Sequence, residues 1–158
     1  MATIPLTQRG FAMLKDELHR LKTVERHGVI QAISEARAQG DLSENAEYEA
    51  AKDKQGFIEG RILEIESKLA AAQVIDPKAV DGEGRVVFGS TVDLEDEESG
   101  AKVTYQIVGD DEADLKQGLV SISSPIARAL IGKIESDIAE VQAPGGVRSY
   151  EITGVRYE

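Results

Sequence analysis

The chain has 158 residues, enough for one ordinary domain or two small ones, and its 41% hydrophobic and 30% charged residues are typical of a soluble folded protein. It has no cysteine, which excludes disulfides and thiolate metal sites, and no signal peptide or bilayer-spanning run, so we expect a cytoplasmic protein without membrane association. The net charge of −11 and the 4% aromatic content disfavour direct binding to bare nucleic acid, so a role there requires a protein partner.

Residues 1–76 contain two long helical patterns. Thr7 is a good N-cap for the first, which should end at Gly40. Its apolar stripe weakens at residues 25–28, where Gly28 costs about 1 kcal/mol relative to alanine and marks a candidate bend. The residues of this stripe are Phe11, Leu14, Leu18 and Leu21, followed by Ile30, Ile33 and Ala36.

The second helical pattern is a heptad seam with one polar position. Its members alternate at spacings of three and four: Tyr48, Ala51, Gln55, Ile58, Ile62, Ile65, Leu69 and Ala72. If the chain turns near residues 41–42, antiparallel partners have numbers that sum to about 83, which pairs Leu21 with Ile62. We therefore predict an antiparallel coiled-coil hairpin roughly 45 Å long.

After Pro77 the periodicity changes from helical to strand-like. Residues 77–84 are predicted to be a linker, and residues 85–158 a small sheet domain. Ser124 and Pro125 open a short helix that ends at Gly132. The fold class is therefore α+β, with strands predicted at residues 85–88, 91–94, 102–108, 119–123, 138–141 and 147–157, the last two joined by a turn at 144–146.

The turn of the hairpin, residues 40–48, carries three acids, Asp41, Glu44 and Glu47. One interpretation is local: Asp41 or Ser43 caps the second helix, and acids favour the positive end of a helix. The other is functional, because two exposed carboxylates can supply part of a Mg²⁺ shell whose other ligands come from a partner.

Several motifs resemble those of the Gre transcript-cleavage factor family. They cover nearly the whole chain, at residues 40–48, 55–57, 59–62, 72–76, 108–114, 124–133 and 144–146. The resemblance implies a transcription elongation factor that binds bacterial RNA polymerase and passes its coiled coil through the secondary channel. There it stimulates the polymerase's own cleavage of backtracked RNA and rescues arrested complexes. Such a factor is not an enzyme by itself and meets DNA only indirectly, through the polymerase.

The resemblance also implies roles for individual residues. Asp41 and Glu44 match the acids that help hold Mg²⁺ and the attacking water; the ion is shared with the polymerase, and no cofactor is bound by the free chain. Arg37 and Lys52 fall where the family has basic residues near the nascent RNA 3′ end. Residues 85–158 should form an FKBP-like antiparallel sheet that docks on polymerase through Ser124, Pro125, Ile126 and Arg128. We expect the free protein to be a monomer.

Two other functions remain open. A Gre-like protein can occupy the channel and inhibit elongation, although intact acids at Asp41 and Glu44 argue against this. An FKBP-like domain also raises the possibility of a prolyl isomerase. That activity needs a lined pocket, for which the second domain offers few aromatic residues: Phe88, Tyr105, Tyr150 and Tyr157.

Overall fold

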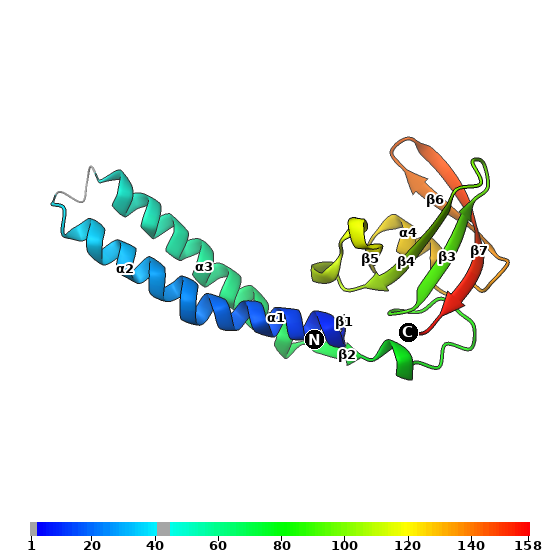
Figure 1. The fold of residues 1–158 in the computed structure, drawn as a ribbon, viewed down its shortest axis with the longest axis horizontal. Coiled ribbons are helices and arrows are strands. Elements are labelled where there is room, and N and C mark those ends of the chain that lie inside the picture. Colours follow the sequence, from blue (N-terminus) through cyan, green and yellow to red (C-terminus); the bar gives the residue numbers. More distant parts are fainter. Residues whose placement is uncertain (1–2, 41–44) are drawn as a thin grey trace. The chain divides into compact units, whose positions relative to one another are not determined.

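A computed structural model of the chain describes residues 3–40 and 45–158 (Figure 1). Contacts divide these residues into two compact units: unit 1 lies within Phe11–Ala72, and unit 2 comprises Thr3–Gly10 and Gln73–Glu158. Unit 1 is helical, whereas unit 2 is mainly a β-sheet with one short α-helix, which confirms the α+β class. Residues 3–10, which the sequence pattern groups with the first domain, pack with unit 2.

Unit 1 is a hairpin whose two helices run antiparallel and side by side (Figure 1). The first helix is continuous through α1 (Gln8–Arg20), a π-helical turn (Leu21–Glu25) and α2 (Arg26–Arg37), and the second is α3 (Ala46–Ala70). The predicted seam of α3 is confirmed, because its buried residues are Ala51, Ile58, Ile62 and Ile65. The helix stops at Ala70 because the chain then forms strand β2 (Ala72–Ile75).

The π-helical turn explains why the apolar stripe of the first helix weakens after Leu21. A π turn holds one residue more than an α turn, so each later residue is rotated by about 100° relative to an unbroken α-helix. A heptad step from Leu21 would place Gly28 in the seam, whereas after the extra residue Val29 takes this position and is 3% exposed. The prediction that Ile30 faces the second helix is wrong, since it is 51% exposed.

Ion pairs join the two helices of the hairpin. Arg61 donates to both carboxylate oxygens of Glu17, at 2.8 and 2.9 Å, and Arg26 donates likewise to Glu59, at 2.9 and 2.8 Å. Hydrogen bonding to its guanidinium partner lowers the pKa of each carboxyl group. Because solvent screens such pairs, they contribute little stability, and their bidentate geometry chiefly favours one pairing of the helices.

Unit 2 is built on a five-stranded sheet in the order β5-β4-β3-β7-β6. The strands are β3 (Thr91–Asp96), β4 (Lys102–Val108), β5 (Leu119–Ser121), β6 (Ile138–Ala143) and β7 (Gly146–Arg156). Neighbouring strands are antiparallel except β4 and β5, which run parallel, so the predicted antiparallel sheet has one parallel pair at this edge. The chain returns between these two strands through 3₁₀ turns at Asp110–Glu112 and Leu115–Gln117.

The segment before β3 differs from its prediction. Residues 85–88 do not form a strand; Arg85 makes an isolated bridge to Ile134, and Val86 exchanges backbone hydrogen bonds of 2.8 Å with Gly132 and Lys133. The predicted linker contains a 3₁₀ turn at Pro77–Ala79. Strand β1 (Ile4–Thr7) pairs with β2 in a separate two-stranded sheet.

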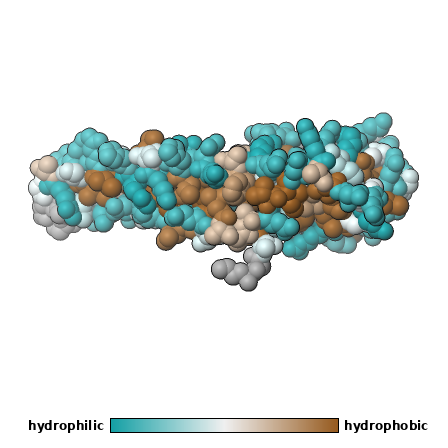
Figure 2. Space-filling model, turned by 90° about the horizontal axis from the view of Figure 1, so that it is seen from below, coloured by the Kyte–Doolittle hydropathy of each residue, from teal (hydrophilic) through white to brown (hydrophobic). Residues whose placement is uncertain are grey.

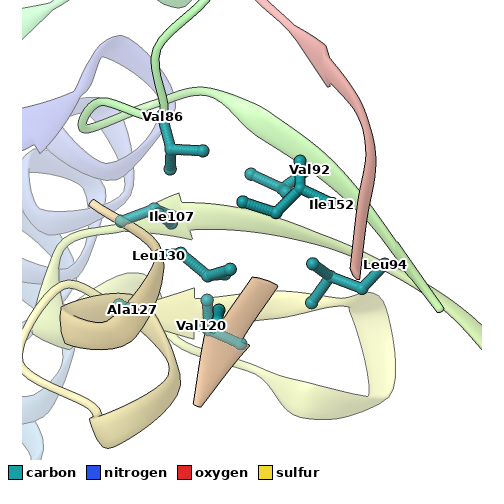
Figure 3. Close-up of a cluster of buried hydrophobic side chains, with 9 residues drawn as sticks. Val86, Val92, Leu94, Ile107, Val120, Ala127, Leu130 and Ile152 are labelled. Carbon is teal, nitrogen blue, oxygen red and sulfur yellow. The ribbon is translucent and has the colours of Figure 1, made fainter. Parts of the chain in front are cut away.

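The core of unit 2 lies between the sheet and α4 (Pro125–Leu130), whose predicted start is confirmed. Ser124 Oγ accepts a hydrogen bond from the Ala127 N–H at 3.2 Å, and Pro125 occupies the first helical turn. Ala127 and Leu130 of α4 are fully buried and meet side chains from the strands (Figure 3). The buried cluster consists of Val86, Val92, Leu94, Ile107, Val120, Ala127, Leu130, Ala139 and Ile152.

A buried carboxylate fastens residues 3–10 to the rest of unit 2. Glu112 is 4% exposed and accepts hydrogen bonds from the N–H groups of Thr7 and Gly109, both at 3.1 Å, and from the Thr7 hydroxyl. The Arg9 guanidinium lies 3.7 Å from the same carboxylate. Thr7 Oγ1 also accepts from the Gly10 N–H at 3.1 Å, which confirms it as the N-cap of α1. A Cβ at Gly10 would lie 2.1 Å from Glu112 Cδ, so any larger residue here would displace the buried carboxylate.

The surface carries hydrophobic patches among hydrophilic side chains (Figure 2). The most exposed large apolar side chains among the described residues are Phe57 and Leu63 of α3 and Leu115 in unit 2. None of the helices in the described part of the chain has both the length and the apolar character that crossing a bilayer demands.

Candidate functional site

The two acids predicted to hold Mg²⁺, Asp41 and Glu44, lie outside the residues that the structure describes. The described chain reaches Gly40 on one side and Asn45 on the other. Gly40 has a φ of +111°, in the region that glycine adopts most readily, three residues after the end of α2. The described part of the first candidate site therefore consists of the end of α2 and the beginning of α3, which flank the two acids in the sequence.

Asn45 links these two helix ends. Its Oδ1 accepts from the Tyr48 N–H at 3.0 Å and caps α3, while its Nδ2 donates to the Ala36 carbonyl, in the last turn of α2, at 2.8 Å. The prediction that Asp41 or Ser43 caps the second helix is wrong, because α3 begins directly after Asn45. One amide thus satisfies a backbone group at each helix end and ties the two ends together.

The two predicted RNA-proximal cations lie in different settings. Arg37 is the last residue of α2, and its Cζ lies 6.0 Å from the centroid of the Tyr48 ring. At this distance the negative face of an aromatic ring attracts a cation. Lys52 lies on α3, where its Nζ donates to Gln55 Oε1 at 3.2 Å. Both cationic side chains are exposed and can meet an anion outside the chain.

The second candidate site is an apolar hollow of about 400 Å³ in unit 2. Of the predicted docking residues, Ser124, Pro125 and Ile126 line this hollow, whereas Arg128 does not. Its lining residues, all in the described part of the chain, include neither a charged nor an aromatic side chain. The remaining apolar wall is formed mainly by Leu115, Leu119, Val120, Val141 and Pro144.

Hydroxyl groups hold one edge of the hollow in place. Asp110 Oδ1 accepts from the hydroxyls of Ser121 and Ser123, the latter at 2.7 Å. Ser124 Oγ donates to the Ser121 carbonyl at 2.6 Å. These bonds connect the end of β5 to the start of α4, so the edge is fixed by the same residues that begin the helix.

Several residues at these sites were not singled out by the sequence patterns. Asn45 could have been found, since asparagine is a preferred N-cap and here precedes an uninterrupted helical stripe. Leu115 gave only a weak signal, an isolated leucine in a polar segment. Outside these sites, the local pattern gave no signal for the burial of Glu112, because its partner Thr7 lies 105 residues away in the sequence.

The chain is similar to known proteins over nearly its whole length. The sequence matches two family models, "Transcription elongation factor, N-terminal" over residues 4–74 and "Transcription elongation factor, GreA/GreB, C-term" over residues 81–157. Transcription elongation factor GreA from Verminephrobacter eiseniae is 74% identical over 157 residues, and that from Ralstonia nicotianae is 73% identical; each alignment covers 99% of both chains. The crystal structure of GreA factor homolog 1 (Gfh1) from Thermus thermophilus is 28% identical, with a TM-score of 0.43, over 98% of this chain and 99% of that chain. The chain therefore belongs to the GreA/GreB family of transcription elongation factors.

Proposed function

We propose that this elongation factor binds bacterial RNA polymerase, inserts the turn of its helical hairpin into the secondary channel and stimulates the polymerase's cleavage of backtracked RNA. The observation that carries the proposal is the acidic motif at residues 40–48, in which Asp41 and Glu44 fall between α2 and α3 in the sequence and Glu47 lies in the first turn of α3. A hairpin held by a single seam is thin enough to enter a channel. Cleavage at the RNA 3′ end then lets an arrested complex resume synthesis. The factor acts in the cytoplasm, as a monomer when free.

The chemistry of the acids supports a metal-linked role. Asp41 and Glu44 would hold Mg²⁺ together with ligands from the polymerase, because this ion keeps several waters and usually accepts only one or two protein carboxylates. When bound, the ion lowers the pKa of the attacking water. The chain's own contribution is to bring two negatively charged groups to a centre that another protein supplies, so we propose a cofactor of the polymerase rather than an enzyme.

The two cations beside the turn complete this site. Arg37 at the end of α2 and Lys52 on α3 would contact phosphates of the nascent RNA 3′ end. Residues 1–75 carry 10 basic and 12 acidic side chains, so their charge is far closer to neutral than that of residues 76–158, with 8 basic and 17 acidic. Nucleic acid already held by the polymerase is therefore repelled less by the hairpin than by the sheet domain.

The apolar hollow supports docking of unit 2 on the polymerase. Ser124, Pro125 and Ile126 line it together with strands β5 and β6, and an apolar side chain of the partner would be buried there. Arg128 lies outside the lining and would contribute at the rim. Association through a desolvated apolar centre and a polar rim is the usual anatomy of a protein interface.

The docking proposal predicts that Leu115→Glu weakens polymerase binding by about tenfold or more, since a carboxylate in the hollow must be desolvated on binding. Leu115 is 72% exposed, so its replacement should not unfold unit 2. Ile138→Glu is the matched control, at an exposed site on β6 that does not line the hollow. Affinity is measured by titrating the fluorescently labelled chain with polymerase. Equal affinities for the two variants would contradict docking at the hollow.

The whole proposal is tested by adding the purified chain to a stalled, backtracked polymerase complex whose RNA is labelled at its 5′ end. We expect the RNA to shorten from the 3′ end faster than in the polymerase alone, and synthesis to resume when nucleotides are supplied. Slower elongation without shortening would instead identify a channel-blocking inhibitor.

A further inference from the structure

Two residues of the 40–48 motif, Asn45 and Tyr48, take no part in the chemistry proposed above. Both contact the end of α2. Asn45 binds the Ala36 carbonyl and the Tyr48 backbone N–H, and the Tyr48 ring lies beside the guanidinium of Arg37. The beginning of α3 therefore holds the last two residues of α2 by two different interactions.

We propose that Tyr48 is a positioning residue that orients Arg37 toward a phosphate of the RNA; this inference rests on the proposed function. An exposed arginine at the end of a helix has many rotamers, and only some direct its guanidinium to a given point. An aromatic ring beside the guanidinium restricts these rotamers through attraction to its face. A contact with the ring face engages no hydrogen-bond acceptor, so the guanidinium N–H groups can still donate to a phosphate.

The ring is itself held in place. Tyr48 lies in the first turn of α3, its side chain is half-buried, and its backbone N–H is fixed by Asn45 at 3.0 Å. Asn45 Nδ2 also donates a hydrogen bond to the carbonyl of Ala36, the residue before Arg37. The arrangement therefore holds both the backbone from which Arg37 extends and the ring beside which its guanidinium lies.

The test compares four variants of the full chain, Arg37→Ala, Tyr48→Leu, their combination and Tyr48→Phe, in cleavage of backtracked RNA. Maximal rate and half-saturating factor concentration are measured separately, at low and at physiological salt. We expect Tyr48→Leu to lower the maximal rate about two- to fivefold, the range for an exposed cation–π contact. Tyr48→Phe keeps the ring and should match the unsubstituted chain. Tyr48→Leu should have no further effect once Arg37 is alanine.

Phe57→Leu is the matched control, because it removes a ring that is 80% exposed elsewhere on α3 and should leave the rate unchanged. Thermal melting followed by circular dichroism checks that Tyr48→Leu folds. An unchanged rate in Tyr48→Leu overturns the inference, as does an equal fall with and without Arg37, which would mean that the ring acts independently. If the unsubstituted chain fails to stimulate cleavage, the proposed function fails; if it cleaves but Tyr48 and Arg37 are uncoupled, only this inference fails.

Discussion

Replacing Asp41 and Glu44 together by alanine is expected to lower stimulated cleavage of backtracked RNA by at least about 100-fold, because the proposed metal-linked step loses both carboxylates that the factor would supply. Folding and polymerase binding should be unchanged, since neither residue caps α3, whose N-cap is Asn45, and docking is proposed to use unit 2. The measurement is the cleavage rate at saturating factor, alongside the affinity of the labelled chain for polymerase.

Glu47→Ala is the matched control for this double substitution. Glu47 belongs to the same motif and is exposed in the first turn of α3, but it has no assigned role in the chemistry. The isosteric pair Asp41→Asn and Glu44→Gln separates loss of charge from loss of side-chain volume, and should be as defective as the alanine pair. Retained cleavage in either double variant would rule out donation of these carboxylates.

The largest loss of stability is expected from Glu112→Ala. The substitution removes a buried acceptor and leaves the N–H groups of Thr7 and Gly109, the Thr7 hydroxyl and the Arg9 guanidinium without their partner. Breaking a buried, charged network in this way costs about 3–5 kcal/mol of the free energy of unfolding. Urea denaturation followed by near-ultraviolet circular dichroism reports mainly on unit 2, which contains three of the chain's four tyrosines, Tyr105, Tyr150 and Tyr157.

Two further variants test whether the loss of stability in Glu112→Ala comes from the buried hydrogen-bond network. Glu98→Ala removes an exposed acid from the turn between β3 and β4 and should change stability by less than about 0.5 kcal/mol. Glu112→Gln keeps the size of the side chain but replaces one acceptor oxygen by a donor, so an intermediate loss is expected. If Glu112→Ala and Glu98→Ala unfold at the same urea concentration, the buried carboxylate does not fasten the N-terminal segment.

The hairpin could be predicted where its signal is local. Ile58, Ile62 and Ile65 recur at spacings of three and four, and all three are buried as this periodicity requires. The π turn could not be predicted in the same way, because in the sequence an inserted residue only makes the apolar periodicity weaker. Whether Gly28 or Val29 enters the seam depends on packing against α3, which is not encoded in the local spacing.

In unit 2 the short helix α4 was predictable, because Ser124 and Pro125 are strong start signals that depend on neighbours only. The parallel pairing of β4 with β5 was not, since alternation within a strand says nothing about its direction relative to a neighbour. Glu112 lies in a run of acids typical of a solvated loop. Its burial depends on Thr7 and Arg9, at the opposite end of the sequence.

At the candidate sites, motif resemblance supplied Asp41, Glu44, Arg37 and Lys52, and these assignments remain predictions. Resemblance also drew attention to residues 124–128, of which Ser124, Pro125 and Ile126 share one apolar hollow. The opposite wall of that hollow, including Leu115, comes from segments that only the folded sheet brings together. Contact-dependent roles such as that of Asn45 likewise required the three-dimensional arrangement.

The π turn at Leu21–Glu25 makes the direction of Arg37 depend on chain length. Deletion of one residue from this turn would convert it into an ordinary α-helical turn, so the first helix would be regular throughout. The residues before Leu21 would keep their orientation, whereas every residue of α2 would be rotated by about 100° about the helix axis. Arg37 would then point away from Tyr48, although nothing near either residue had changed. A relative with a shorter first helix would therefore need a compensating substitution in α3 to preserve this pair.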